Sequence, residues 1–170
     1  MASSQPSSSQ DWDLPVYPIA VAGQPDFTPV KDFIANFYRV SDITDDVEQW
    51  TQLFIKGAIV KMGDGPSTPD QIALKDLRTN MWKDVKTRKH TVTRVFPAVF
   101  PDFQDGVLAF SASGGVVTEA KNGGDTSSLF TQRNWSAFGQ LTTMDDGVWK
   151  LAYYEVYFGG QWSASSESEL

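Results

Sequence analysis

Apolar residues recur every three or four positions in three stretches of the N-terminal half, which is the spacing of an amphipathic helix. The first stretch begins at Thr28-Pro29, with threonine as the N-cap and proline in the first turn. The second begins at Asp45 and has Glu48 three residues on, an aspartate form of the capping box. The third begins at Thr68-Pro69-Asp70. The three apolar stripes are Val30, Phe33, Ile34, Phe37 and Tyr38, then Val47, Trp50 and Phe54, then Ala73, Leu74, Leu77 and Met81.

The rest of the chain favours β-strands, because β-branched and aromatic residues alternate there with polar ones. The runs with this character are 58–62, 88–96, 107–121, 127–143 and 148–158. Pro97 ends the second run, and Gly114-Gly115 predicts a bulge in the third. Glycine-containing turns at 122–124 and 145–147 predict hairpins between the long runs. This order predicts an α+β fold. Three N-terminal helices pack in a strongly curved, mixed and mainly antiparallel sheet, and one end of this cone stays open as a pocket.

The composition narrows the class of protein. The chain has 170 residues, which suits one domain, and 13% of them are aromatic, which is enough for a substantial core. It has no cysteine, which excludes a disulfide scaffold, a thiolate metal site and a cysteine nucleophile. It has one histidine, which excludes sites with several histidine ligands. We therefore expect no metal site and no cofactor.

The acidity comes largely from the two ends. The formal net charge is −7, but Asp11, Asp13, Glu167 and Glu169 lie in Ser-rich stretches without Lys or Arg, and without these four acids the charge is −3. We expect disordered tails at 1–14 and 161–170 around a single domain at 15–160. A pI near 4.6 argues against a nucleic-acid partner. No secretory or membrane-spanning segment is visible, so we expect no membrane association and a cytoplasmic location.

An ordered set of short segments extends over roughly residues 28 to 158. The segments are Phe37-Tyr38-Arg39-Val40-Ser41-Asp42, Trp50 with Leu53-Phe54, Met81-Trp82, Arg88-Lys89-His90, Val95-Phe96-Pro97, Asp146-Gly147-Val148-Trp149-Lys150 and Tyr154-Glu155-Val156-Tyr157. With the order of elements, they resemble the SnoaL-like branch of the nuclear-transport-factor-2-like superfamily, of the type common in fungi. The resemblance implies a deep apolar pocket and a homodimer through the outer face of the sheet. Ketosteroid isomerase, scytalone dehydratase, polyketide cyclases and non-catalytic binding domains share that superfamily.

Comparison with scytalone dehydratase implies positions for catalytic groups. Asp42 falls at the end of the first helix and His90 on the matching strand, as in that family, and Ser136 falls at its serine. Phe138 stands where that family has asparagine, Met62 and Ser41 stand near its two tyrosines, and the family's second histidine has no counterpart. The catalytic set is therefore incomplete for that dehydration.

His90 is the strongest candidate for chemistry, because an imidazole accepts and donates protons near neutral pH. Asp42 either fixes the tautomer of His90 or acts alone as a base next to a carbonyl. Ser136, Asn134 or a tyrosine would hold a substrate oxygen as charge develops on it. The alternatives are a surface histidine, an aspartate that only ends a helix, and ordinary pairs of polar residues on a sheet.

The strand alternation also assigns residues to the pocket and to the outer face. The residues expected to bind substrate are Tyr38, Trp50, Met62, Trp82, Asn134, Phe138, Tyr153 and Glu155. Arg133 has the opposite parity and is expected on the outer face. The aromatic members of the set could equally belong to the core.

These patterns leave two hypotheses. The first is a cofactor-independent enzyme of fungal-type secondary metabolism, an isomerase, cyclase or dehydratase. It would act by acid/base catalysis on a small, apolar, carbonyl-bearing substrate that resembles a polyketide or terpenoid. The alternative is a non-catalytic module of the same fold that binds a hydrophobic small molecule or a protein partner.

Overall fold

The computed structural model describes residues 15–18, 25–44, 46–68, 70–100, 106–121 and 130–161. The expected tails lie outside these ranges, except for Gln161, which the structure places at the end of the last strand. The elements follow in the order α1 (Thr28–Ser41), α2 (Val47–Thr51), β1 (Phe54–Met62), α3 (Gln71–Asn80), β2 (Val85–Ala98), β3 (Val107–Ala120), β4 (Phe130–Thr143) and β5 (Trp149–Gln161). Within the described ranges, no helix is both long and apolar enough to cross a bilayer.

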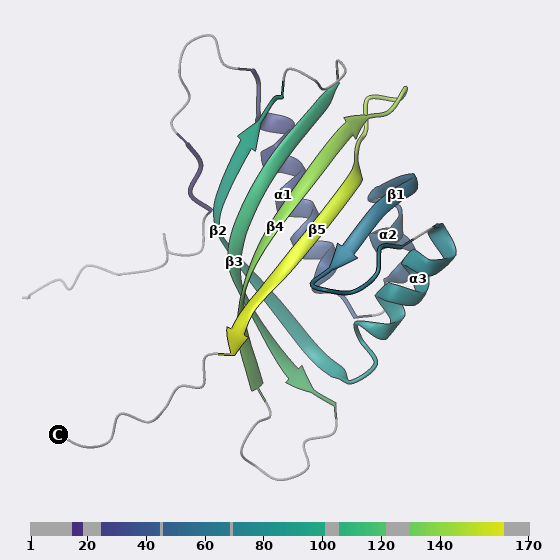
Figure 1. Ribbon diagram of the computed structural model, residues 1–170, viewed down its shortest axis with the longest axis vertical. Helices are drawn as coiled ribbons and strands as arrows, with labels where there is room; N and C mark the ends of the chain where they lie inside the picture. Colours follow the sequence, from purple (N-terminus) through teal and green to yellow (C-terminus); the bar gives the residue numbers. More distant parts are fainter. Residues whose placement is uncertain are drawn as a thin grey trace, which may run out of the picture.

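One curved sheet organises the molecule. Its strand order is β1-β5-β4-β3-β2, with β1 parallel to β5 and every other neighbouring pair antiparallel. The long strands twist strongly, α1 lies across one face of the sheet, and α2 and α3 group beside β1 (Figure 1). The predicted fold class, helices packed in a curved and mainly antiparallel mixed sheet, is confirmed.

The helices begin close to the predicted positions. The first begins at Thr28, but its N-cap residue is Phe27, so the prediction of Thr28 as the N-cap is wrong. The second is capped by the side chain of Asp46, which accepts the backbone N–H three residues on. The predicted start at Asp45 lies outside the described residues. Asp70 caps the third helix in the same way, as the sequence predicts.

Two predicted boundaries are wrong. Phe54 belongs to β1 and not to the second helix, which ends at Thr51. Pro97 does not end β2, because it pairs with Phe110 inside the ladder. Proline lacks a backbone N–H, but β2 is an edge strand of the sheet, where one side of the ladder needs no donor.

A one-residue bulge in β5 decides which side chains face the helices. Leu141 of β4 pairs with Leu151, and the preceding residue of β4 pairs with Tyr153, which leaves Ala152 as an extra residue. Leu151 and Tyr154 are therefore both buried, although they are three positions apart. The alternation of inward and outward residues shifts by one beyond this point.

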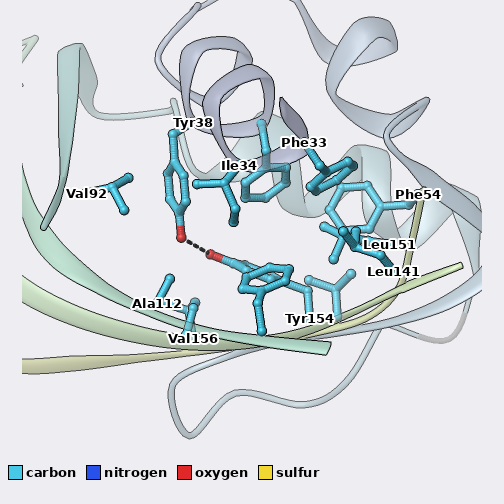
Figure 2. Close-up of a cluster of buried hydrophobic side chains, with 14 of the residues drawn as sticks. Phe33, Ile34, Tyr38, Phe54, Val92, Ala112, Leu141, Leu151, Tyr154 and Val156 are labelled. Atoms are coloured by element: carbon cyan, nitrogen blue, oxygen red, sulfur yellow. Dashed lines mark hydrogen bonds between the residues drawn. The ribbon is translucent and has the colours of Figure 1, made fainter. Parts of the chain in front are cut away.

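Phe37 lies at the centre of the aromatic core beneath α1. Its ring centroid is 5.1 Å from that of Tyr154, 5.9 Å from Phe54 and 6.4 Å from Trp50. Figure 2 shows how α1 and the concave face of the sheet supply facing side chains to this cluster. Aromatic contacts of this kind contribute about 0.5–1.5 kcal/mol each beyond the burial of their area. The core therefore fixes α1 against the sheet.

The convex face of the sheet also carries apolar side chains. Phe96 is 53% exposed and Tyr157 is 48% exposed, and Phe138 shares the row of cross-strand partners that begins at Phe96. A homodimer through this face stays a prediction.

Gly139 allows β4 to approach the core closely. A Cβ atom at this position would lie 2.4 Å from the ring of Phe110. Gly139→Ala is therefore expected to lower the free energy of unfolding by about 1–3 kcal/mol, because the packed ring has to move. Urea denaturation measures this loss. The matched control is Gly115→Ala on β3, where the nearest atom to a new Cβ is 3.8 Å away. Equal stability of the two variants would contradict the close packing at Gly139.

Candidate active site

A cavity of about 310 Å³ lies between the C-terminal half of α1 and the concave face of the sheet. Its volume is at the lower end of the range for small-molecule sites, about 300–1,000 Å³. Buried apolar and aromatic residues form its inner wall: Phe37, Trp50, Val116, Trp135, Tyr154 and Val156. A largely apolar wall with few polar groups suits a small organic ligand.

Asp42 joins the end of α1 to β2. It is the C-cap residue of the helix, and its carboxylate accepts two hydrogen bonds from His90. The backbone N–H of His90 lies 2.9 Å from Oδ2, and the imidazole Nδ1 lies 2.5 Å from Oδ1. Because an ionised carboxylate only accepts, Nδ1 carries a proton in this arrangement. Two bonds to one residue fix both the position of the strand and the tautomer of the ring.

The second nitrogen of His90 is free to act. His90 lines this cavity, whereas Asp42 does not, and both residues border a separate hollow beside α1. Among the described residues, no hydrogen bond involves Nε2. The imidazole centroid lies 5.2 Å from that of Tyr38 and 6.0 Å from that of Trp135. In the neutral ring with a proton on Nδ1, Nε2 is an acceptor that can take a proton from a ligand.

Arg78 of α3 satisfies the carbonyls at the C-terminus of α1. Its guanidinium donates to the carbonyls of Val40, Ser41 and Ile43 at 3.0, 3.0 and 2.6 Å, and the residue is fully buried. Burial lowers the pKa of Arg78 to about 10, with repulsion from Arg88 as a smaller cause. The group therefore stays charged at neutral pH. Its charge also offsets the partial negative charge of a helix C-terminus.

Two buried tyrosine hydroxyls meet in the cavity wall. Tyr38 Oη and Tyr154 Oη are 3.1 Å apart, and a dashed line in Figure 2 marks the hydrogen bond between them. Burial raises the pKa of Tyr154 to about 12, and it raises the pKa of Tyr38 well above its ordinary value. Both phenols are therefore neutral at physiological pH. One hydroxyl donates to the other, so the second keeps a proton that it can donate to a ligand oxygen.

Two arginines complete the polar part of the wall. Arg88 donates to the carbonyl of Met81 at 2.7 Å and stacks over Trp82, with 4.5 Å between its Cζ atom and the ring centroid. Burial lowers the pKa of Arg88, and the nearby charge of Asp42 opposes this shift. Arg133, from β4, is more exposed.

Several predicted site residues line the cavity. Its wall includes Tyr38, Trp50, Met62 and His90. Asp42 contacts His90, which the first of its two predicted roles, fixing the tautomer of the ring, requires. Trp82 does not line the cavity: it is buried behind Arg88, which covers its ring. The structure does not test the catalytic roles of these residues.

Five predicted residues on β4 and β5 lie outside the cavity. They are Ser136, Asn134, Phe138, Tyr153 and Glu155. On β5, the extra residue at Ala152 reverses the expected parity, so Tyr154 faces inward. On β4, the alternation is regular, but the polar positions face outward. Glu155 instead binds Lys61 and Tyr153 on the convex face, and these hydrogen bonds lower its pKa to about 2.

Sequence reasoning missed Arg133, Trp135 and Tyr154 as parts of the wall. The prediction placed Arg133 on the outer face, which is wrong. A signal was present in β4, because buried Trp135 and Leu141 share the parity of Arg133. Choosing the apolar positions of β4 as the inner face would have found Arg133 and Trp135.

Metal ligands are not grouped in the described ranges, where no three His, Asp or Glu side chains lie close enough to hold an ion. No protein-family model matches the chain, and no curated protein matches its sequence.

Solved structures do match the fold. A candidate scytalone dehydratase from Novosphingobium aromaticivorans superposes with a TM-score of 0.67 at 10% identity, over 84% of this chain and 87% of that one. ActVI-ORFA from Streptomyces coelicolor gives 0.61 at 13% identity, over 76% and 94%. Nuclear transport factor 2 from Cryptosporidium parvum gives 0.59 at 12% identity, over 76% and 90%. The chain therefore has the nuclear-transport-factor-2-like fold, as the resemblance implied, and a fold shared by an enzyme and a transport factor does not assign an activity.

Arg78 is expected to be essential for the end of α1. Arg78→Met keeps an apolar side chain in place but leaves three carbonyls without their donor, so the free energy of unfolding should fall by about 2–4 kcal/mol. Urea denaturation measures the loss. The control is Arg39→Met, on the exposed face of the same helix, which should change stability by less than about 0.5 kcal/mol. An unchanged stability of Arg78→Met would show that these carbonyls do not need the arginine.

Proposed function

We propose that this protein is a cofactor-independent enzyme that moves a proton on a small, apolar, carbonyl-bearing substrate. The observation that supports this most directly is the Asp42–His90 pair. The carboxylate of Asp42 holds Nδ1 of a histidine that lines the cavity, and among the described residues Nε2 has no hydrogen-bond partner. An oriented base beside an apolar cavity is the arrangement that proton transfer next to a carbonyl requires.

The proposed reaction begins at His90. Nε2 takes a proton from the carbon next to the carbonyl, and the electron pair of that C–H bond forms an enolate. The free hydroxyl proton of the Tyr38–Tyr154 pair donates to the oxygen on which the negative charge develops. The imidazolium, stabilised by Asp42, then returns the proton to another carbon or to a departing hydroxyl. The first outcome is an isomerisation and the second a dehydration, and neither needs a redox partner.

The cavity wall suits a substrate with a flat apolar body. Tyr38 and Trp135 stack with centroids 4.8 Å apart, and Trp50 and Met62 border the same space. Such walls exclude water, which strengthens hydrogen bonds to a developing charge. We therefore propose polyketide- or terpenoid-like carbonyl compounds as the substrate class.

The proposed base can be tested before the natural substrate is known. The Kemp elimination of 5-nitrobenzisoxazole needs only one base, which removes a ring proton and releases a coloured phenolate as the N–O bond breaks. We expect the wild-type protein to accelerate this reaction with saturation kinetics. Substitution His90→Gln should lower the rate at least about 100-fold, because the base is lost. Substitution Asp42→Asn should lower it about tenfold or more, because the amide no longer enforces the tautomer.

The control for these variants is Ser136→Ala. Its side chain is exposed on the convex face, so its rate should equal that of the wild type. Circular dichroism checks that each variant is folded. A folded His90→Gln variant with wild-type turnover would contradict the proposal. Saturable binding of the probe without any turnover in the wild type would favour the alternative, a non-catalytic module that binds hydrophobic ligands.

A further inference from the structure

The charged side chains that line the cavity, among the described residues, are of one sign. This part of the wall contains Arg88, Arg133 and the basic residue His90 but no aspartate or glutamate. The chain as a whole has 21 acidic and 14 basic residues, so a wall with only basic groups departs from the average surface. A concave surface with one sign of charge favours a ligand of the opposite sign.

The sheet register places the two arginines around one space. His90, Val116 and Arg133 form one row of partners across β2, β3 and β4. Arg88, Thr118 and Thr131 form the next row, two residues further along each strand. Neighbouring strands are about 4.8 Å apart, so β2 and β4 are about 10 Å apart, and the two long side chains can reach a common ligand group between them. His90 lies in the row of Arg133 and on the same strand as Arg88.

Neither arginine is neutralised within the described residues. Arg88 has a backbone carbonyl and an aromatic ring as its partners, and its nearest acid, Asp42, is already bound to His90. Arg133 makes no hydrogen bond or ion pair there. Guanidinium groups held by packing, with donors left over, are typical of sites for planar oxyanions.

The rest of the cavity favours a carboxylate over a phosphate. Phosphate sites in proteins commonly add backbone N–H groups at a helix N-terminus. Here the N-terminal residues Thr28, Val47 and Gln71 of the three helices do not line the cavity. The helix ends that do reach it are C-termini, that of α1 at Ser41 and that of α3 at its C-cap residue Met81, and their partial charges are negative. An anionic group therefore has a single favourable place, at the arginines.

We propose that the ligand of this cavity is an apolar carboxylic acid, whose carboxylate binds Arg88 and Arg133 while its apolar body extends past His90 toward the Tyr38–Tyr154 pair. This inference rests on the proposed function only in taking the cavity as the ligand site. It adds a specificity for charge that acid/base catalysis alone does not require. Neutral carbonyl compounds of the same shape should then bind more weakly than the carboxylic acid.

Three probes of one shape test this inference. Naphthalene-2-carboxylate, naphthalene-2-carboxamide and 2-naphthyl phosphate are titrated against the full chain, and binding is followed by isothermal titration calorimetry. We expect the wild type to bind the carboxylate about tenfold or more tighter than the carboxamide and tighter than the phosphate. Arg133→Gln should weaken carboxylate binding about tenfold and leave carboxamide binding unchanged. Arg88→Gln should do the same, if it folds. The side chain of Arg133 has no described hydrogen bond or ion pair to lose, so Arg133→Gln decides the question alone.

The matched control is Arg94→Gln. Arg94 lies on the same strand as Arg88 and carries the same charge, but it is exposed and does not line the cavity. The bulge at Thr93 turns it away from the face of His90. This variant should bind the carboxylate as the wild type does. Equal binding of carboxylate and carboxamide, tighter binding of the phosphate, equal losses in Arg94→Gln and Arg133→Gln, or no binding at millimolar concentration would each overturn the proposal.

Failure of this inference is distinct from failure of the proposed activity. If the wild type catalyses the Kemp elimination but binds the carboxylate and the carboxamide equally, the proposed base is supported and the proposed carboxylate site is contradicted. If the wild type prefers the carboxylate but shows no turnover, the proposed carboxylate site is supported and the proposed base is contradicted.

Discussion

The two hydrogen bonds from His90 to the carboxylate of Asp42 connect the end of α1 to β2, and the proposed chemistry depends on them. Asp42 places a negative charge at a helix C-terminus, where the partial charge of the backbone is also negative. Such a position is unfavourable unless positive groups surround it. Arg78 binds the last carbonyls of the same helix, and Arg88 lies near the carboxylate on the other side.

This local network explains why the site lies where it does. Trp50 donates from Nε1 to Ser41 Oγ at 3.1 Å, and Arg78 lies over the ring of the same tryptophan. The aromatic cluster around Phe37 then fixes the orientation of the whole helix. Each element therefore restrains the end of α1, and a base must be restrained in this way to keep its geometry during a reaction. This restraint has an energetic cost, because the charge of Arg78 is buried and has no carboxylate partner among the described residues. The fixed carbonyls at the end of α1 compensate for the lost hydration of that charge.

Much of this arrangement could be predicted from the sequence, because it depends on regular patterns. The apolar stripe from Val30 to Tyr38 predicts α1, and Asp70 predicts the start of α3. The face of β5 could not be predicted in the same way. A single extra residue, Ala152, reverses the alternation without leaving a pattern of its own, and only the paired strand reveals it. The burial of Arg78 was also not predicted. A signal was present, because Arg78 follows Leu74 by four residues and so lies on the apolar stripe of α3.

The tautomer of the single histidine tests the central claim most directly. Because the chain contains one histidine, ¹⁵N NMR of histidine-labelled protein reports on His90 without ambiguity. The neutral ring is predicted to carry its proton on Nδ1, with Nε2 unprotonated, and Asp42→Asn is predicted to remove this preference. A wild-type ring that carries its proton on Nε2, or a tautomer that does not respond to Asp42→Asn, would contradict the account.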